Sequence, residues 1–139
     1  MATVELSFTA LPAHVRTARL VATAVARRSG VDESLLDEVR IAVGEACSRA
    51  VEGHQLYCPA EPVRLALTDV AGRFEVEVTD TCAPDARWPG APDGQGAAAG
   101  MPAGLGIAMI EGLADDVQIS ETSAGTIIRM SWPSAGAGR

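Results

Sequence analysis

Hydrophobic and polar positions alternate in five short stretches of the chain and recur at helical spacing in three others. Alternation with a period of two is typical of half-buried strands, whereas apolar residues at i, i+3, i+4 and i+7 indicate amphipathic helices. The alternation predicts strands over residues 4–8, 63–67, 74–80, 117–119 and 126–132. The helical spacing predicts helices over residues 13–29, from an Asp32 N-cap to about Glu52, and from Gly104 to Leu113.

Glycine and aspartate residues mark where several of these elements begin and end. Gly30 is expected to stop the first helix, Asp32 to cap the second, and Gly53 to end it. Residues 55–61 are expected to form a loop. A turn over Asp69–Gly72 joins two of the predicted strands, so this part of the chain predicts a hairpin.

The order of the predicted elements favours a two-layer α+β architecture. Alternations of strand, helix and strand are too few for a doubly wound sheet. We therefore expect an α/β sandwich, in which a mixed, largely antiparallel sheet of about five strands carries three helices on one face. Residues 1–133 are expected to form a single domain with a Gly/Ala-rich lid loop over about 83–103, followed by a disordered tail over 134–139.

Charge and composition argue against several classes of protein. The 139 residues include 11 basic and 18 acidic side chains, for a net charge of −7. Nucleic acids and anionic lipid surfaces both attract basic proteins, so neither is an expected partner. The apolar runs are too short to span a bilayer, and the N-terminus lacks the pattern of a signal peptide. We therefore expect a cytoplasmic protein.

The three cysteines, Cys47, Cys58 and Cys82, include no C-x-x-C pair. An odd number without a spaced pair is untypical of a disulfide framework. A zinc site drawn from His54, Cys58 and Cys82 lacks an obvious fourth ligand. We therefore expect ordinary thiols.

Three segments carry residues suited to chemistry. On the second predicted helix, positions 38, 42, 45, 49 and 52 share a polar or small face opposite the apolar stripe. Taken by itself, this spacing is explained by a solvent-exposed helix surface on which Glu45 and Arg49 form a pair one turn apart. A strand that ends in Asp80 and a glycine turn that opens the third helix are two further features. Glycines at a helix N-terminus let backbone N–H groups approach an anion.

With these three features in this order, the chain resembles the anti-sigma-factor serine kinases of bacterial partner-switching systems. These kinases have the Bergerat ATP-binding fold. The resemblance extends from Thr3 to about Pro133. It rests on the segments LDEVRIAVGEACSRAVEGH (36–54), VEVTD (76–80), AGLGIAMIEGLADDV (103–117) and GTIIRMSW (125–132). In the family these are the first nucleotide-site helix, the strand that delivers an adenine-reading Asp, the phosphate turn with its helix, and the closing strand.

The resemblance implies a role for each matching residue. Glu45 matches the general base that accepts a proton from a substrate serine. Asp80 matches the carboxylate that accepts a hydrogen bond from the adenine amino group, and Thr126 matches a hydroxyl near the base or an adenine-bridging water. The phosphate-cradling turn matches Gly104, Leu105 and Gly106, and the ATP lid matches residues 85–103.

Two departures from the family pattern concern catalysis. Arg49 stands where the family has an Asn that helps to hold Mg²⁺, and a guanidinium has no acceptor atom for a metal. Arg49 is instead suited to contact a phosphate. The family's D-x-G-x-G motif reads DTCAP over residues 80–84, so both of its glycines are missing. The resemblance therefore implies an ATP site, while the departures make Mg²⁺ binding doubtful and predict weak or absent kinase activity.

Three functions follow from these residues. The favoured one is an anti-sigma-type regulatory protein that binds an anti-sigma antagonist, a sigma factor or both, with weak or no kinase activity. The alternative is an active ATP-dependent serine kinase that phosphorylates the antagonist with Glu45 as base. The third is a structural or dimerisation domain. The family resemblance also implies a homodimer formed through the outer face of the sheet.

Overall fold

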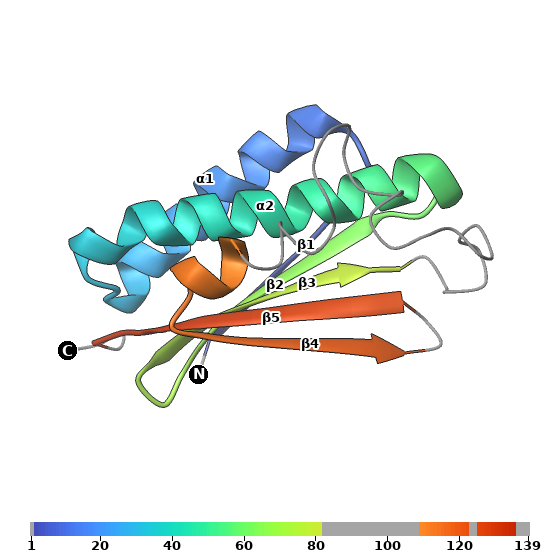
Figure 1. The fold of residues 1–139 in the computed structure, drawn as a ribbon. Helices are drawn as coiled ribbons and strands as arrows, with labels where there is room; N and C mark the ends of the chain where they lie inside the picture. The colour runs from blue at the N-terminus through green and yellow to red at the C-terminus, as the bar shows by residue number, and fades with distance from the viewer. Residues whose placement is uncertain (1, 82–108, 123–124, 136–139) are drawn as a thin grey trace.

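The fold has two layers, a five-stranded sheet and helices that cover one of its faces (Figure 1). The computed structural model describes residues 2–81, 109–122 and 125–135. Residues 109–113 are the described part of the third predicted helix, and Ile110 within them is fully buried. The longer elements are β1 (Ala2–Phe8), α1 (Pro12–Ser29), α2 (Glu33–Tyr57), β2 (Val63–Val70), β3 (Arg73–Asp80), β4 (Asp116–Thr122) and β5 (Gly125–Pro133).

The strands lie in the order β1-β2-β3-β5-β4, and each neighbouring pair is antiparallel. The predicted fold class, an α/β sandwich with a largely antiparallel sheet and helices on one face, is therefore confirmed. β5 lies between β3 and β4, so the end of β3 and the start of β5 are direct neighbours although they are far apart in the sequence.

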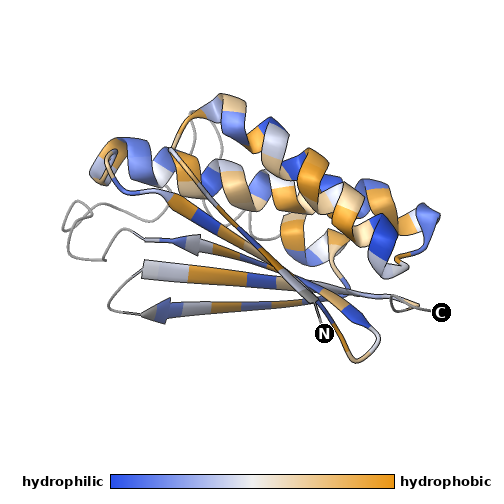
Figure 2. Cartoon of the chain, turned by 180° about the vertical axis from the view of Figure 1, so that it is seen from behind, coloured by the Kyte–Doolittle hydropathy of each residue, from blue (hydrophilic) through white to orange (hydrophobic). Residues whose placement is uncertain are grey.

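The core lies between the helices and one face of the sheet. Leu67, Val76 and Met130 form a row across β2, β3 and β5, and all three are buried. Figure 2 shows how hydrophobic and hydrophilic residues alternate along the strands. The opposite face carries polar pairs such as Arg129 and Glu77, whose Nε and Oε2 atoms are 2.8 Å apart. The period-two pattern in the sequence thus reports which side of each strand is buried.

The connection between the two long helices agrees with the sequence prediction. α1 ends at Gly30, which adopts a left-handed conformation with φ 92°. Asp32 caps α2, because its Oδ1 atom accepts a hydrogen bond from the Ser34 amide at 3.1 Å. Within the described residues, no helix combines the length and the apolar character needed to cross a membrane.

The C-terminal end of α2 differs from the prediction. The helix does not stop at Gly53 but continues to Tyr57, and the Cys58 amide donates a hydrogen bond to the His54 carbonyl at 2.8 Å. The expected loop over 55–61 is therefore shorter by three helical residues. A glycine inside a helix costs about 1 kcal/mol relative to alanine, but it leaves the backbone hydrogen bonds intact. The buried His54 side chain, which follows Gly53, holds the helix against the sheet.

The β2–β3 hairpin and the segment after β5 contact each other. The hairpin turns at Ala71 and Gly72, both with positive φ (52° and 77°), as a two-residue type I′ turn requires. Ser134 donates a backbone hydrogen bond to Gly72 at 2.8 Å, and Ala135 donates one to Gly30 at 3.0 Å. The first two residues of the segment predicted as a tail are thus hydrogen-bonded, and residues 136–139 lie outside the described part.

Candidate functional site

Two of the predicted site residues are neighbours at one end of the sheet. Asp80 is the last residue of β3, and it pairs directly with Thr126 of β5. Each is two positions from the buried pair Val78 and Ile128, so both side chains point to the helix-covered face. Directly opposed residues of this kind have Cβ atoms about 5 Å apart. A carboxylate and a hydroxyl group therefore lie side by side beneath the helices.

Gly53 brings α2 into contact with this end of the sheet. A Cβ atom added at Gly53 would lie 3.5 Å from Oδ2 of Asp80, which is ordinary van der Waals contact, so the helix and the carboxylate are direct neighbours. The Asp80 side chain is 13% exposed. The glycine that the sequence suggested as a helix end is instead a point of close approach between a helix and a strand.

A charged face of α2 extends from this contact toward the helix N-terminus. Arg49 and Glu45 precede Gly53 by one and two turns, which places them about 6 and 12 Å from it along the helix axis. Burial raises the pKa of the Glu52 carboxyl, the nearby Glu45 carboxylate raises it further, and Arg49 lowers it. Ala42, on the same face, is fully buried. These side chains therefore lie on a partly covered flank of the helix and influence each other's charge.

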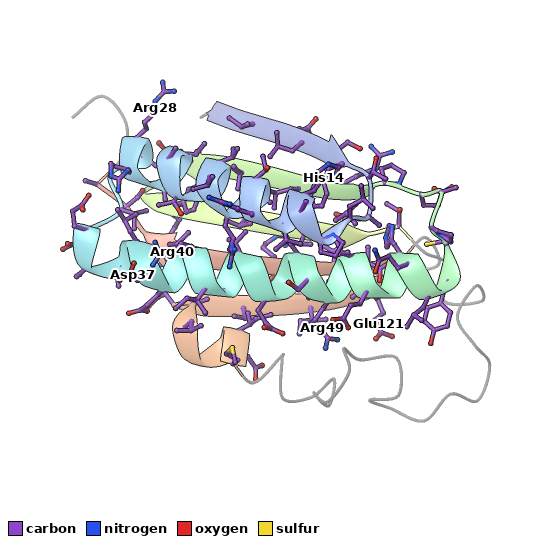
Figure 3. All side chains as sticks on the ribbon, turned by 90° about the horizontal axis from the view of Figure 1, so that it is seen from above. His14, Arg28, Asp37, Arg40, Arg49 and Glu121 are labelled. Atoms are coloured by element: carbon purple, nitrogen blue, oxygen red, sulfur yellow. The ribbon has the colours of Figure 1, made fainter. Side chains whose placement is uncertain are left out.

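The sheet face beside Thr126 is only partly covered. Ile119 of β4 pairs with the buried Ile128, yet it is 40% exposed. Glu121 pairs with Thr126 in the same register and extends the row from β5 to β4. In Figure 3, which looks down on the helices, Arg49 and Glu121 lie on the side of α2 away from α1. The end of the sheet and the charged flank of α2 thus border one side of the molecule.

His54 makes contacts that the sequence did not predict. The side chain is fully buried, and its Nδ1 atom lies 2.8 Å from the carbonyl oxygen of Glu61. Its Nε2 atom accepts a hydrogen bond from the Thr81 amide at 3.0 Å and lies 3.1 Å from Oδ1 of Asp80. The available signal was weak: His54 follows Ala50 by four residues and so falls on the apolar stripe of the helix.

The cysteines differ from the prediction of ordinary thiols. Cys47 is a free thiol, and burial raises its pKa to about 12, so it stays protonated and unreactive near neutral pH. Cys58, directly after α2, is disulfide-bonded, which contradicts the prediction for this residue. The spacing of the cysteines gave no signal for this bond. Cys82 lies outside the described residues.

The described residues contain part of the predicted site. In the structure, Asp80 is the cross-strand neighbour of Thr126, and Glu45 and Arg49 lie on successive turns of α2. Within the described ranges, no group of three or more His, Cys, Asp and Glu residues is arranged to hold a metal ion. The predicted phosphate turn (Gly104, Leu105 and Gly106) and the expected lid over 83–103 lie outside these ranges.

Comparisons with known proteins identify the family and the fold of this chain. The histidine kinase-like ATPase domain family matches residues 8–132. The solved structure of the RsbU and RsbW domains of Rv1364c from Mycobacterium tuberculosis matches with a TM-score of 0.69 at 20% identity. The match covers 96% of this chain and 33% of that chain, so this chain spans about a third of that structure's length. A likeness at this identity concerns the fold. No curated protein matches the chain.

Proposed function

This chain belongs to the histidine kinase-like ATPase domain family, and from this premise we propose that it is a nucleotide-binding regulatory protein of the anti-sigma-factor type. Its partner is an anti-sigma antagonist, a sigma factor or both. The fold likeness to a structure with an RsbW domain supports this branch of the family. The observation that carries the proposal is the position of Asp80, a little-exposed carboxylate between α2 and Thr126.

The proposed nucleotide lies along the charged flank of α2. Asp80 accepts a hydrogen bond from the adenine amino group, with the Thr126 hydroxyl beside it. Arg49 and Glu45 follow at about 6 and 12 Å from Gly53 along the helix axis. This separation suits an elongated ligand that has a base at one end and negative charge further along.

The proposed binding mode uses Arg49 in place of a metal ligand. A guanidinium carries only donors and a permanent positive charge, so it can contact a phosphate directly but cannot ligate Mg²⁺. Phosphoryl transfer depends on groups that neutralise the transferring phosphate, and one such group can be worth about 10³–10⁵ in rate. We therefore expect ATP binding that needs no Mg²⁺, with weak or absent transfer of phosphate.

An active serine kinase that phosphorylates the antagonist is the alternative. The observation that favours it is Glu45, a partly buried carboxylate on the flank of α2 that also carries Arg49. In either case we expect a cytoplasmic protein whose net charge of −7 disfavours binding to nucleic acid and to membranes. The family resemblance implies a homodimer.

Thermal unfolding with and without saturating ATP, each with Mg²⁺ and with EDTA, tests this function. A ligand at 100 times its Kd adds about 2.7 kcal/mol of stability, which raises the Tm by several degrees. We expect a shift that persists in EDTA and that is largely lost in Asp80→Asn. The matched control is Asp37→Asn, which removes an exposed carboxylate near the other end of α2.

The other outcomes separate the alternatives. A shift that requires Mg²⁺, together with phosphate transfer to a purified antagonist, would establish the kinase. The absence of a shift under every condition would reject nucleotide binding and leave a protein that acts through its surface alone. Co-elution with a purified antagonist or sigma factor in size-exclusion chromatography tests the partner directly, and failure to bind either would favour a structural domain.

A further inference from the structure

The protonation of His54 follows from its partners. The Nδ1 atom lies 2.8 Å from the Glu61 carbonyl oxygen, and because a carbonyl only accepts hydrogen bonds, Nδ1 carries a proton. The Nε2 atom accepts a hydrogen bond from the Thr81 amide, so Nε2 carries none. His54 is thus a neutral imidazole in the Nδ1–H form, and both of its nitrogens are used to join α2 to the chain on either side of β2 and β3.

These bonds fix the residue that follows Asp80. The Thr81 amide is held by His54, and the Thr81 hydroxyl donates a second hydrogen bond to the Pro62 carbonyl at 2.8 Å. Because Thr81 is held at both its backbone and its side chain, the backbone has little freedom at the point where the Asp80 side chain leaves the strand.

The Asp80 carboxylate itself is confined by the same helix. Its Oδ1 atom lies 3.1 Å from Nε2 of His54, a contact without a hydrogen bond because both atoms only accept, and its Oδ2 atom would lie 3.5 Å from a Cβ atom added at Gly53. Consecutive residues of α2 therefore flank the two carboxylate oxygens. The imidazole is rigid and fully buried, so it sets one wall of the space in which the carboxylate can lie.

We infer that His54 is a positioning residue of the nucleotide site. By accepting the Thr81 amide at Nε2 it fixes the backbone from which the Asp80 side chain leaves, so that the carboxylate is placed to accept from the adenine amino group at C6, where guanine has a carbonyl oxygen. The inference rests on the proposed nucleotide site. It adds that selectivity for adenine over guanine depends on the acceptor at Nε2, whereas the bond from Nδ1 to Glu61 serves the fold.

Two substitutions separate the two nitrogens of His54. In His54→Gln, the side-chain oxygen reaches the place of Nε2 and can accept from Thr81, but the donor to Glu61 is lost. In His54→Asn, the side-chain amide lies near the place of Nδ1 and can donate to Glu61, but the acceptor at Nε2 is lost. Thr81→Val is the matched control, since it removes the bond to Pro62 and keeps the amide that His54 holds.

Competition against a fluorescent ATP analogue gives the Kd values of ATP and GTP for the wild type and each variant. We expect His54→Asn to lose about tenfold in ATP affinity and to bind GTP unchanged, so that its preference falls to that of Asp80→Asn. We expect His54→Gln and Thr81→Val to keep the wild-type preference within about threefold. A preference preserved in both His54 variants would reduce His54 to a packing residue and overturn the inference.

A second measurement does not depend on nucleotide. The chain has two histidines, so nitrogen-15 NMR resolves both rings once His14→Gln identifies the signals. We expect a protonated Nδ1 and an unprotonated Nε2 for His54. The opposite tautomer, or a doubly protonated ring, would overturn the inference even if ATP binds. A wild type with the expected tautomer that binds neither ATP nor GTP would refute the proposed nucleotide site and, with it, the role of His54.

Discussion

Arg49 is the residue whose chemistry most affects what the site can do. Its Nε atom is buried, and its charge lowers the pKa of Glu52 against the opposing effects of burial and of Glu45. One permanent positive charge thus lies between two carboxylates on one flank of α2. An amide at this position would offer an oxygen to a metal ion, and it would leave the pKa of Glu52 higher than it is now.

Arg49→Asn is expected to make ATP binding depend on Mg²⁺. In the wild type, Mg²⁺ is expected to leave the affinity for ATP unchanged, whereas in the variant it raises the affinity about tenfold, because the amide oxygen can ligate the ion. Isothermal titration calorimetry in Mg²⁺ and in EDTA measures both affinities. Arg40→Asn is the control, since Arg40 lies on the same helix in an exposed ion pair with Asp37. Loss of partner binding in Arg49→Asn would place Arg49 in the partner interface instead.

At the scale of the elements, α1 and α2 are in close contact at Gly44. A Cβ atom added at Gly44 would lie 2.6 Å from Cδ of Arg19, so the aliphatic part of the Arg19 side chain crosses α2 at this glycine. Gly44 is buried within the helix, where alanine would ordinarily be preferred by about 1 kcal/mol. Packing between the helices therefore opposes the local helix propensity at this position.

A double-mutant cycle measures how far the contact with Arg19 offsets the helix propensity at residue 44. Gly44→Ala in the wild type is expected to change the free energy of unfolding by less than about 0.5 kcal/mol, because the gain in propensity is offset by displacement of Arg19. In an Arg19→Ala background the same change is expected to stabilise by about 1 kcal/mol. Urea denaturation measures both values. Gly112→Ala, with no atom within 4 Å of the added Cβ, should show no coupling to Arg19. Equal effects of Gly44→Ala in both backgrounds would contradict the packing argument.

At the scale of the whole molecule, several bonds tie the end of α2 to the end of β3. The His54 ring is hydrogen-bonded to the Thr81 amide and to the Glu61 carbonyl, and the Thr81 hydroxyl donates a hydrogen bond to the Pro62 carbonyl. Cys58, which lies between His54 and Glu61 in the chain, is disulfide-bonded. Hydrogen bonds therefore connect α2 to the end of the sheet that carries Asp80.

Reduction of the disulfide is expected to destabilise the protein. Loss of a native disulfide typically costs about 2–4 kcal/mol, chiefly because the unfolded chain gains freedom, and this lowers the Tm by several degrees. Differential scanning calorimetry with and without a reductant measures the shift, and Cys58→Ser should reproduce it in oxidising buffer. Cys47→Ala keeps the bridge, so its Tm should still fall on reduction. A Tm that reductant leaves unchanged would show that the bridge does not contribute.

Short-range patterns were sufficient to predict the elements and the fold class. Period-two alternation located the strands, Gly30 and Asp32 marked the boundary between the long helices, and Asp80 was recognised at the end of its strand. These signals depend on residues close together in the chain, whose spacing alone sets which side is buried and where a helix is capped.

The remaining features depend on contacts between residues far apart in the sequence. Gly53 had the pattern of a helix stop, yet it lies within α2 at the point where the helix contacts Asp80. The contacts of His54 with Thr81 and Asp80 likewise form only when α2 packs on β3, and the disulfide of Cys58 had no signal in the spacing of the cysteines. No local pattern encodes such contacts, because they form when the burial of a whole apolar helix face brings distant polar groups within bonding distance. The sequence thus specified the parts and their order, and packing set the surroundings of the carboxylate on which the proposed function rests.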